Sequence, residues 1–327
     1  MRNAETGTFP GGGVPVRMPP GPCPVKGRIL CSRGGQYDVE TDRGVLTATL
    51  RGRIKRGGER SGEKVVVGDE VTLAEAAEGE GRGSAWIIED VHERRTALVR
   101  RAPGKAPRPK PVVANVDLLL VVFAVRRPEP NLRMLDRFLV LAEVSDIQAH
   151  LVINKVELAT DPAELSAFDV YEEIGYPVLH TSVQTGQGIE VLRDLLRDRV
   201  SALTGPSGVG KSSLLNSVEP GLALRVGSVG HKGRHTTVTA QLVPLSQGGY
   251  VADTPGLREV GLWNIEADYM DDGFPEMRAV REGCRFAGSC THLHEPGCAV
   301  REAVTAGEID AGRYESYRLL RTDPDFV

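Results

Sequence analysis

The segment GPSGVGKSS, residues 205–213, limits the fold more than any other part of this 327-residue chain. The apolar stretch VSALT precedes it, and KSSLLNSV, which has a helical pattern, contains its last residues. A strand, a glycine-rich turn and a helix in this order form a P-loop, in which backbone N–H groups surround phosphate oxygens at the helix N-terminus. The segment therefore predicts a nucleoside phosphate site in an α/β domain. The alternative, a chance glycine turn, does not explain the flanking strand and helix.

The P-loop pattern gives each of its residues an expected role. Lys211 is expected to reach the β- and γ-phosphates and to serve catalysis, and Ser212 to place its hydroxyl on Mg²⁺. The remaining loop residues are expected to contact the nucleotide mainly through backbone N–H groups; they are Gly205, Pro206, Ser207, Gly208, Val209, Gly210 and Ser213.

Strand and helix patterns alternate in front of the P-loop. VDLLLVVFAV, AHLVIN and PVLHTS predict strands, and NLRMLDRFLVLAEV, DPAELSAFDVYEEI and IEVLRDLLRD predict helices after each of them. Such alternation implies right-handed βαβ crossovers and a mostly parallel sheet. The apolar run 112–125 contains Asn115 and Asp117 and is too short to cross a bilayer, so we expect a buried strand there.

Two segments after the P-loop are typical of Mg²⁺ and γ-phosphate contacts in a GTPase. The sequence DTPG follows the apolar stretch GGYVA, so Asp253 is expected near Mg²⁺ and the N–H of Gly256 near the γ-phosphate. GRHTTVTA, residues 233–240, offers Thr236 or Thr237 as a Mg²⁺ ligand that is present only in the triphosphate state.

Two segments in front of the P-loop favour guanine over adenine. Asn154, Lys155, Val156 and Glu157 resemble a guanine clamp, since one carboxylate can accept both the N1–H and the 2-amino group of guanine. The stretch TSV, which contains Ser182 and Val183, resembles the segment that contacts guanine O6.

The order of these motifs predicts the connectivity of the domain. In ordinary GTPases the guanine clamp follows the P-loop, whereas here it precedes it. We therefore expect a circularly permuted GTPase domain over residues 112–262, which is possible because the termini of compact domains often lie close together.

The first third of the chain has a different pattern. Residues 1–24 are rich in Gly and Pro and predict a flexible arm without a signal peptide, and residues 25–101 predict about five short strands of a small barrel. An OB-type barrel fits the length, and an SH3-like barrel fits as well. The basic, proline-rich residues 102–111 predict a stiff linker.

Basic residues are concentrated in this first third. Residues 1–115 hold 20 Lys/Arg against 14 Asp/Glu, while the remainder holds 20 against 30. The basic runs are either an ordinary solvated surface or a binding surface for a polyanion such as RNA.

The cysteines are crowded near the C-terminus. CRFAGSCTHLHEPGC, residues 284–298, holds three of the five cysteines of the chain. Three thiolates and one imidazole, from His292 or His294, would form a closed tetrahedral Zn²⁺ site, and unrelated free thiols are the alternative. Residues 263–327 are therefore expected to form a mainly helical, zinc-binding domain in a protein of the reducing cytoplasm.

The barrel, the permuted GTPase motifs, GRHTT, DTPG and the Cys/His tail together resemble the RsgA family, also known as YjeQ or EngC, from about residue 25 onward. The resemblance implies a GTPase that matures the 30S ribosomal subunit, binds 16S rRNA, and hydrolyses GTP to GDP with stimulation by that subunit. It also implies one structural Zn²⁺, with the ligands Cys284, Cys290, His292 and Cys298. The chain departs from the family in Glu157, where an aspartate is usual, and in a slightly long first cysteine gap.

The residues expected to orient water for GTP hydrolysis predict a slow intrinsic turnover. The position after the DTPG glycine, which is often a glutamine, holds Leu257, and its side chain cannot orient water. His235 is the candidate for activating or positioning water, and the alternative is an exposed loop histidine without a role. We expect a cytoplasmic monomer with no membrane partner. The rival functions are a P-loop ATPase or kinase of a small metabolite and a zinc-containing RNA-binding protein with an inactive nucleotide domain.

Overall fold

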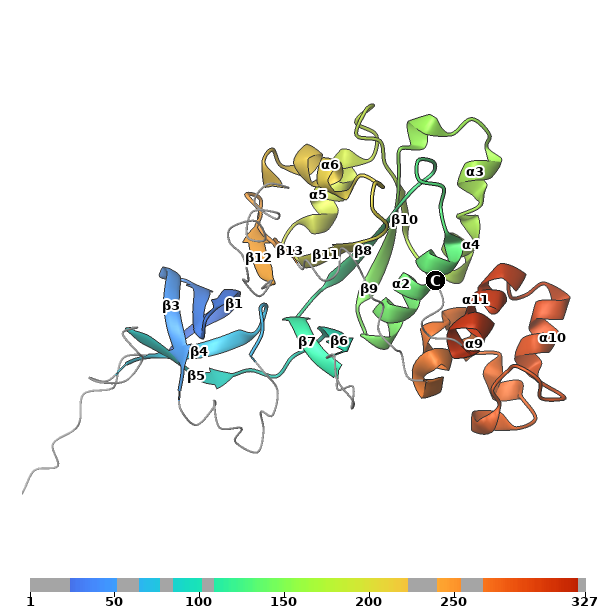
Figure 1. Ribbon diagram of the computed structural model, residues 1–327, viewed down its shortest axis with the longest axis horizontal. Helices are drawn as coiled ribbons and strands as arrows, with labels where there is room; N and C mark the ends of the chain where they lie inside the picture. The colour runs from blue at the N-terminus through green and yellow to red at the C-terminus, as the bar shows by residue number, and fades with distance from the viewer. Residues whose placement is uncertain are drawn as a thin grey trace, which may run out of the picture.

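The computed structural model describes residues 24–51, 65–76, 85–101, 109–222, 240–253 and 267–322. Three units follow one another along an elongated molecule (Figure 1): a β-barrel at one end, an α/β sheet in the middle and a helical unit at the other end. None of the helices in the described part of the chain has the length and apolarity needed to span a lipid bilayer.

Five strands form a closed barrel at the N-terminal end. They are β1 (Val25–Arg33), β2 (Gln36–Thr41), β3 (Gly44–Leu50), β4 (Glu70–Glu75) and β5 (Trp86–Val91). The barrel order is β1-β2-β3-β5-β4 with a β1–β4 closure, and β3 pairs with β5 in parallel. Alternate residues such as Val71 and Leu73 are fully buried inside it. The parallel pair excludes an SH3-like meander, whose sequential strands pair antiparallel, and the expected OB-type barrel is confirmed.

The expected linker 102–111 is wrong at its C-terminal end. Pro109–Ala114 is strand β7, which pairs with β6 (Ala97–Arg101) in a two-stranded sheet, while residues 102–108 lie outside the described residues. Leu98 and Val113 face each other in this pair and are both fully buried. Their burial favours a strand, which the proline content of the segment had hidden.

The apolar run 112–125, expected as one strand, is broken at Asn115. This residue has a left-handed backbone (φ 55°), its Oδ1 accepts a hydrogen bond from the N–H of Arg95 at 2.9 Å, and its Nδ2 donates to the carbonyl oxygen of Gly68 at 3.0 Å. Asp117 Oδ2 accepts from the N–H of Val200 at 2.8 Å, just before β8 begins. Both polar side chains thus have partners that the sequence pattern could not indicate.

The central sheet contains six strands in the order β10-β9-β8-β11-β13-β12 (Figure 1), and all are parallel except β12. Their bounds are β8 (Leu118–Ala124), β9 (Gln148–Asn154), β10 (Val178–His180), β11 (Val200–Thr204), β12 (Gln241–Pro244) and β13 (Tyr250–Asp253). The strand in front of the P-loop, β11, lies in the middle of the sheet although it comes fourth in the chain. This is the permuted connectivity that the motif order predicts.

Helices cover both faces of this sheet. Every position of β8 is apolar, so side chains on both of its faces must be shielded from water. Leu119, Val121 and Phe123 share a core with α2 and α4, while Leu118, Leu120 and Val122 share another with α5 and α6. The helices are α2 (Leu132–Val144), α3 (Ala163–Ser166), α4 (Asp169–Ile174), α5 (Ile189–Leu196) and α6 (Lys211–Val218). The single helix expected from DPAELSAFDVYEEI is two short ones, with the buried Phe168 between them in the core that contains α2.

The C-terminal unit is built from short helices that pack on α2. They are η4 (Ala267–Gly273), α9 (Pro275–Arg278), η5 (Arg281–Gly283), η6 (Ala287–Ser289), α10 (Ala299–Ala306) and α11 (Ala311–Thr322). Phe274, Met277 and Tyr317 form its core together with the three cysteines and Val140 of α2. The expected helical, cysteine-bearing unit is confirmed.

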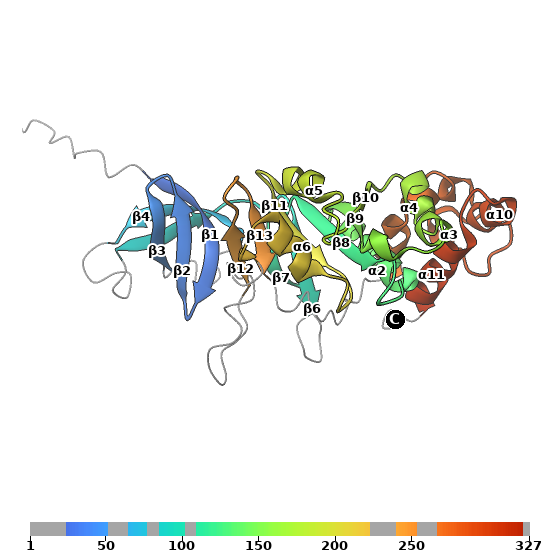
Figure 2. The same cartoon turned by 90° about the horizontal axis from the view of Figure 1, so that it is seen from above.

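The barrel joins the central sheet through an edge pairing of β1 with β12, at Cys31 and Gln241 (Figure 2). Beside this pairing, the Tyr250 hydroxyl donates a hydrogen bond to the Glu40 carboxylate, and the Arg28 guanidinium lies 5.2 Å from the centre of the Tyr250 ring. The strand β12 begins immediately after the predicted switch segment 233–240. The barrel is therefore attached to a strand that continues directly from that segment.

Candidate nucleotide site and Cys/His cluster

The P-loop lies at the edge of the sheet where the parallel strands end. Gly205 follows β11 with φ +132°, and a Cβ there would lie 2.0 Å from the carbonyl oxygen of Val122, so only glycine fits. Lys211 begins α6, and its ammonium donates to the carbonyl oxygens of Gly205 at 2.5 Å and Pro206 at 2.7 Å. The ammonium thus lies inside the curve of the loop, the position that a P-loop lysine needs to reach phosphates.

The expected guanine clamp contacts the P-loop directly. Asn154 Nδ2 donates a hydrogen bond to the carbonyl oxygen of Val209 at 2.8 Å, and Lys155 Nζ donates to that of Gly208 at 2.7 Å. A Cβ on Gly210, which has φ +101°, would lie 2.4 Å from Asn154 Nδ2. Two segments separated by about 50 residues, in the reverse of the usual order, therefore meet at one edge of the sheet.

The clamp residues are held by the strand next to them. Thr181 Oγ1 donates to Asn154 Oδ1 at 3.2 Å, which leaves the Asn154 amide group oriented toward Val209. Ser182 Oγ accepts from the N–H of Thr185 at 3.1 Å, and Val183 is 38% exposed. The segment that was expected to contact guanine O6 therefore lies beside the clamp.

Glu157 has an unusual environment for a carboxylate. Its Oε2 is buried and meets no hydrogen-bond donor among the described residues. A buried carboxylate oxygen without a donor is unfavourable by several kcal/mol in an apolar setting, so it calls for a partner, which a ligand can supply. The two donors of a guanine edge would satisfy it.

Sequence reasoning missed one wall of this site, the segment that follows β8. The carbonyl oxygen of Arg127 accepts a hydrogen bond from Lys155 Nζ, and Pro128 Cδ lies 3.7 Å from the position of a Cβ on Gly208. The sequence did contain a signal for it, because ligands of parallel sheets bind outside the carboxyl ends of the strands and β8 lies next to β11 in the middle of the sheet.

The second candidate site gathers the Cys/His residues. The ligand atoms of Cys284, Cys290, His292 and Cys298 all lie within 4.8 Å of one another, and all four residues are buried. His292 Nδ1 is 3.5 Å from the Cys284 sulfur and 3.4 Å from that of Cys298. The competing His294 is exposed and outside this group. Three sulfurs and one imidazole nitrogen at these separations fit a tetrahedral metal ion, and the donor set is that of structural zinc.

Comparisons with known proteins agree with the GTPase character of the nucleotide site. The RsgA GTPase family profile matches residues 91–263. A small ribosomal subunit biogenesis GTPase RsgA of Gemmatimonas aurantiaca is 51% identical over 91% of this chain and 96% of its own length, and that of Moorella thermoacetica is 46% identical over 90% and 95%.

The chain belongs to the RsgA GTPase family.

Two solved structures are similar to this chain over most of its length. YjeQ from Thermotoga maritima superimposes with a TM-score of 0.73 at 35% identity, covering 92% of this chain and 98% of YjeQ. YloQ, described as a circularly permuted GTPase, superimposes with a TM-score of 0.69 at 28% identity, covering 92% and 94%.

Several RsgA-type motif residues lie outside the part of the chain that the structure describes. Asp253 ends β13, where its backbone pairs with Gln241, but its side chain lies outside the described residues. The expected switch and γ-phosphate residues also lie outside them; they are His235, Thr236, Thr237, Gly256 and Leu257. Of the three expected Mg²⁺ ligands, the structure places only the side chain of Ser212, exposed in the first turn of α6.

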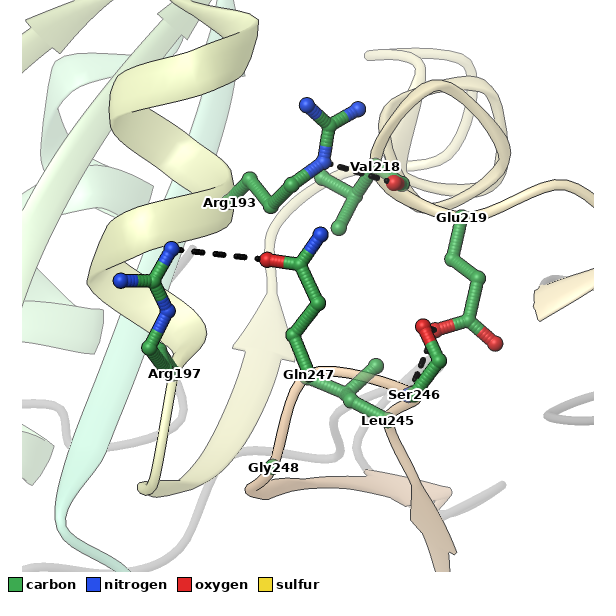
Figure 3. A pocket seen from close by; sticks show the side chains of 8 residues that line it. All are labelled: Arg193, Arg197, Val218, Glu219, Leu245, Ser246, Gln247 and Gly248. Carbon is green, nitrogen blue, oxygen red and sulfur yellow. Dashed lines mark hydrogen bonds between the residues drawn. The ribbon is translucent and has the colours of Figure 1, made fainter.

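A small cavity lies at the opposite end of the P-loop helix (Figure 3), between α5, the end of α6 and the β12–β13 turn. Arg193 donates to the carbonyl oxygens of Val218 at 3.0 Å and Ser217 at 3.2 Å, and Glu219 Oε2 accepts from the N–H and the hydroxyl of Ser246, both at 2.9 Å. The Arg193 bonds satisfy carbonyl groups at the C-terminus of α6, and the Glu219 bonds tie that end to the β12–β13 turn, so we assign the cavity a structural role.

The loop that carries the Cys/His cluster is held by one carboxylate. Glu295 accepts hydrogen bonds from the hydroxyl and N–H of Thr291 and from the N–H groups of Leu293 and His294. The Thr291 hydroxyl is the main reason that the pKa of Glu295 falls to about 2. Since the folded-state pKa lies below the usual value, this stabilisation is complete above about pH 4.3 and is lost as the pH falls through about 2.

Replacing Cys298 with serine is expected to remove the metal and loosen the C-terminal unit. A hard hydroxyl replaces one of the soft thiolates that zinc prefers, and structural zinc contributes folding free energy directly. Metal analysis of the purified protein should fall from about one zinc per chain to a small fraction of that. Cys31→Ser is the control, because Cys31 is a buried barrel cysteine outside the cluster. Full zinc content in Cys298→Ser would contradict the ligand set.

Proposed function

We propose that this chain is a GTPase that acts in the late maturation of the 30S ribosomal subunit. One contact carries the proposal: Asn154 and Lys155 bind the carbonyl oxygens of the P-loop, which places the guanine-type clamp next to the phosphate-binding loop. The relatives that resemble this chain over nine-tenths of its length are named small ribosomal subunit biogenesis GTPases, in agreement with this function.

The nucleotide chemistry follows from the residues around that contact. Glu157 would accept the N1–H and 2-amino protons of guanine, with Asn154, Ser182 and Val183 shaping the base pocket. The backbone of the loop from Gly205 to Ser213 and the ammonium of Lys211 would hold the phosphates. Ser212, Asp253 and Thr237 would complete the Mg²⁺ site, and the metal would neutralise charge on the β- and γ-phosphate oxygens.

Hydrolysis is proposed to be slow until a partner completes the site. Leu257 has no polar atom with which to orient water, so we assign that role to His235. A ribosomal partner that positions His235 against the attacking water would then raise the turnover rate, with GDP and phosphate as the products.

The flanking units are proposed to hold rRNA. The barrel and its basic segments would bind 16S rRNA at one end of the molecule. Residues 263–327, with one structural zinc ion, would bind it at the other end. The barrel pairs through β1 with β12, the strand that follows the switch segment, so the nucleotide state would bias the barrel position. This function would place a monomeric protein in the cytoplasm, where ribosomes mature.

Turnover of GTP with and without small ribosomal subunits tests the proposal. We expect stimulation of at least about ten-fold by the subunits, because partner-completed GTPases gain several orders of magnitude. ATP should be hydrolysed far more slowly under both conditions. Equal turnover of ATP and GTP would favour the rival metabolite kinase or ATPase, and an absence of turnover at any subunit concentration would favour an RNA-binding protein with an inactive nucleotide domain.

The same assay tests the catalytic role of His235 independently of whether the protein is a GTPase. His235→Ala should lose most of the stimulated rate while retaining GTP binding, because the histidine acts on water and not on the nucleotide. Undiminished stimulation in this variant would remove His235 from the mechanism and leave the GTPase assignment intact.

A further inference from the structure

The loop between the first two cysteines of the cluster, residues 285–289, extends from the C-terminal unit into solvent. Each of its five residues is exposed. Phe286 is 42% exposed, and it is the single aromatic residue among the large apolar side chains exposed in the described ranges. The core of the same unit contains Phe274 and Tyr317, and Tyr314 is partly buried against it, so these aromatic side chains differ from Phe286 in facing the core.

Hydrogen bonds hold this loop in one conformation. The N–H groups of Ala287, Ser289 and Cys290 donate to carbonyl oxygens three residues earlier at 3.0–3.1 Å, and Ser289 Oγ donates to the carbonyl oxygen of Phe286 at 2.8 Å. Arg285 N–H donates to the carbonyl oxygen of Gly297 at 3.0 Å, which ties the loop to its other flank. These hydrogen bonds therefore fix the backbone that carries the exposed Phe286 ring.

The surroundings of the ring are cationic and open. The Arg285 guanidinium lies 5.7 Å from the centre of the Phe286 ring, and no carboxylate occurs between residues 285 and 289. The nearby Glu295 directs its oxygens at backbone N–H groups of its own turn. A Cβ on Gly288 would meet no atom of the described residues within 4 Å, so a flat group can approach the loop closely.

We propose that Phe286 and Arg285 form a stacking site for an unpaired base of RNA. An aromatic face stacks on any base, here the face of Phe286 that Arg285 does not cover, and the guanidinium on the other face can bind the adjacent phosphate. A protein partner is a poorer fit, since protein hot spots are aromatic anchors within a larger apolar patch and Phe286 has no exposed large apolar neighbour among the described residues of its unit. The identity of the RNA as rRNA rests on the proposed function; the stacking site itself does not.

Binding of a single-stranded oligoribonucleotide that carries one 2-aminopurine tests this site in the zinc-loaded full-length protein. Stacking quenches 2-aminopurine fluorescence, so wild type should quench it at low salt. Phe286→Leu keeps an apolar side chain but removes the π face, and its affinity should fall roughly 5-fold to 150-fold, the range for loss of one stacked base. Phe286→Trp should bind at least as tightly as wild type. Val191→Ala, at a position that is 58% exposed on α5, should change nothing.

The outcomes distinguish this inference from the proposed function. Wild-type affinity and quenching in Phe286→Leu, or no quenching by wild type, would overturn the stacking site even if small subunits still stimulate GTP turnover. Loss of quenching in Phe286→Leu with unchanged zinc content and intrinsic turnover would support it, even if small subunits fail to stimulate hydrolysis. A variant that binds RNA normally but loses binding to a ribosomal protein would assign the ring to a protein partner and overturn the inference.

Discussion

Glu157→Gln is expected to lower the affinity for GTP by at least about 100-fold, because it would remove the two hydrogen bonds proposed from guanine to a charged acceptor, each worth about 1.5–3 kcal/mol. The glutamine keeps the length of the side chain but directs an N–H group at the N–H groups of guanine. Glu157 Oε2 is already buried without a donor among the described residues, so water cannot easily replace the lost contact.

The same substitution should raise the relative affinity for xanthosine triphosphate. Xanthine has an oxygen at position 2, which can accept from the glutamine amide, whereas guanine has an amino group there. A site built to bind a specific donor pattern discriminates strongly against a base that lacks it. The preference for one triphosphate over the other should therefore shift in favour of xanthosine.

Titration with fluorescent analogues of the two triphosphates measures this change. Glu157→Asp keeps the charge and should keep the preference for GTP, and it also tests whether the longer side chain matters. Glu173→Gln, an exposed glutamate on α4, is the neutral control. An unchanged ratio of affinities in Glu157→Gln would show that guanine is recognised elsewhere.

Arg313→Met is expected to destabilise the docking of the C-terminal unit by about 3–5 kcal/mol, the usual result of removing one partner from a buried ion pair. Arg313 of α11 and Asp136 of α2 are 1% and 3% exposed. The guanidinium donates to Asp136 at 2.8 Å and to both oxygens of Glu276 at 2.8 and 3.2 Å. Without it, two carboxylates stay buried without a counter-charge.

The neighbouring groups reinforce this cluster. Tyr171 of α4 donates a hydrogen bond to Asp136 at 2.8 Å, and the guanidinium lies 4.6 Å from the centre of the Phe274 ring. Burial alone would lower the pKa of Arg313, but Asp136 and Glu276 outweigh it and raise the pKa. The arginine therefore stays charged, and the C-terminal unit is fixed to α2 and α4 of the central sheet.

Hydrogen exchange of the α11 amides measures local opening of this unit without assuming that a three-unit protein unfolds in one step. The triple variant Arg313→Met, Asp136→Asn, Glu276→Gln removes all three charges of this cluster and should recover most of the protection, because neutral replacements of buried ion pairs are often tolerated. Arg318→Met is the matched control on the same helix, since this arginine is 45% exposed and pairs with Glu315 at the surface. Equal protection in wild type and Arg313→Met would show that apolar packing alone holds the unit in place.

Local chemistry made much of the fold predictable. The glycines of the P-loop, the strand in front of it and the helix behind it lie within a short segment, so sequence spacing alone indicates them. Alternation of strands and helices likewise indicates a parallel sheet, and the reversed order of the clamp and the loop indicates its permuted connectivity. Such patterns depend on neighbours in the chain, which the sequence displays directly.

Contacts between segments that are far apart in the sequence could not be predicted from local patterns. The basic segment at Pro109 became a strand because Leu98 and Val113 bury each other, and the apolar run broke at Asn115 because Gly68 and Arg95 supply its partners. His292 joined the cysteines while His294 stayed in solvent, although both have nearly the same spacing. None of these outcomes has a local signal.

The sequence by itself determined the α/β core, the barrel, the cysteine-bearing tail and the residue types able to bind a guanine nucleotide. Only the tertiary structure decided that Asn154 contacts Val209, that a buried oxygen of Glu157 meets no donor in the described ranges, and that Arg313 fixes the tail to α2. The physical reason is that the free energy of a buried polar group depends on partners supplied by remote parts of the chain, and those partners exist only once the chain has folded.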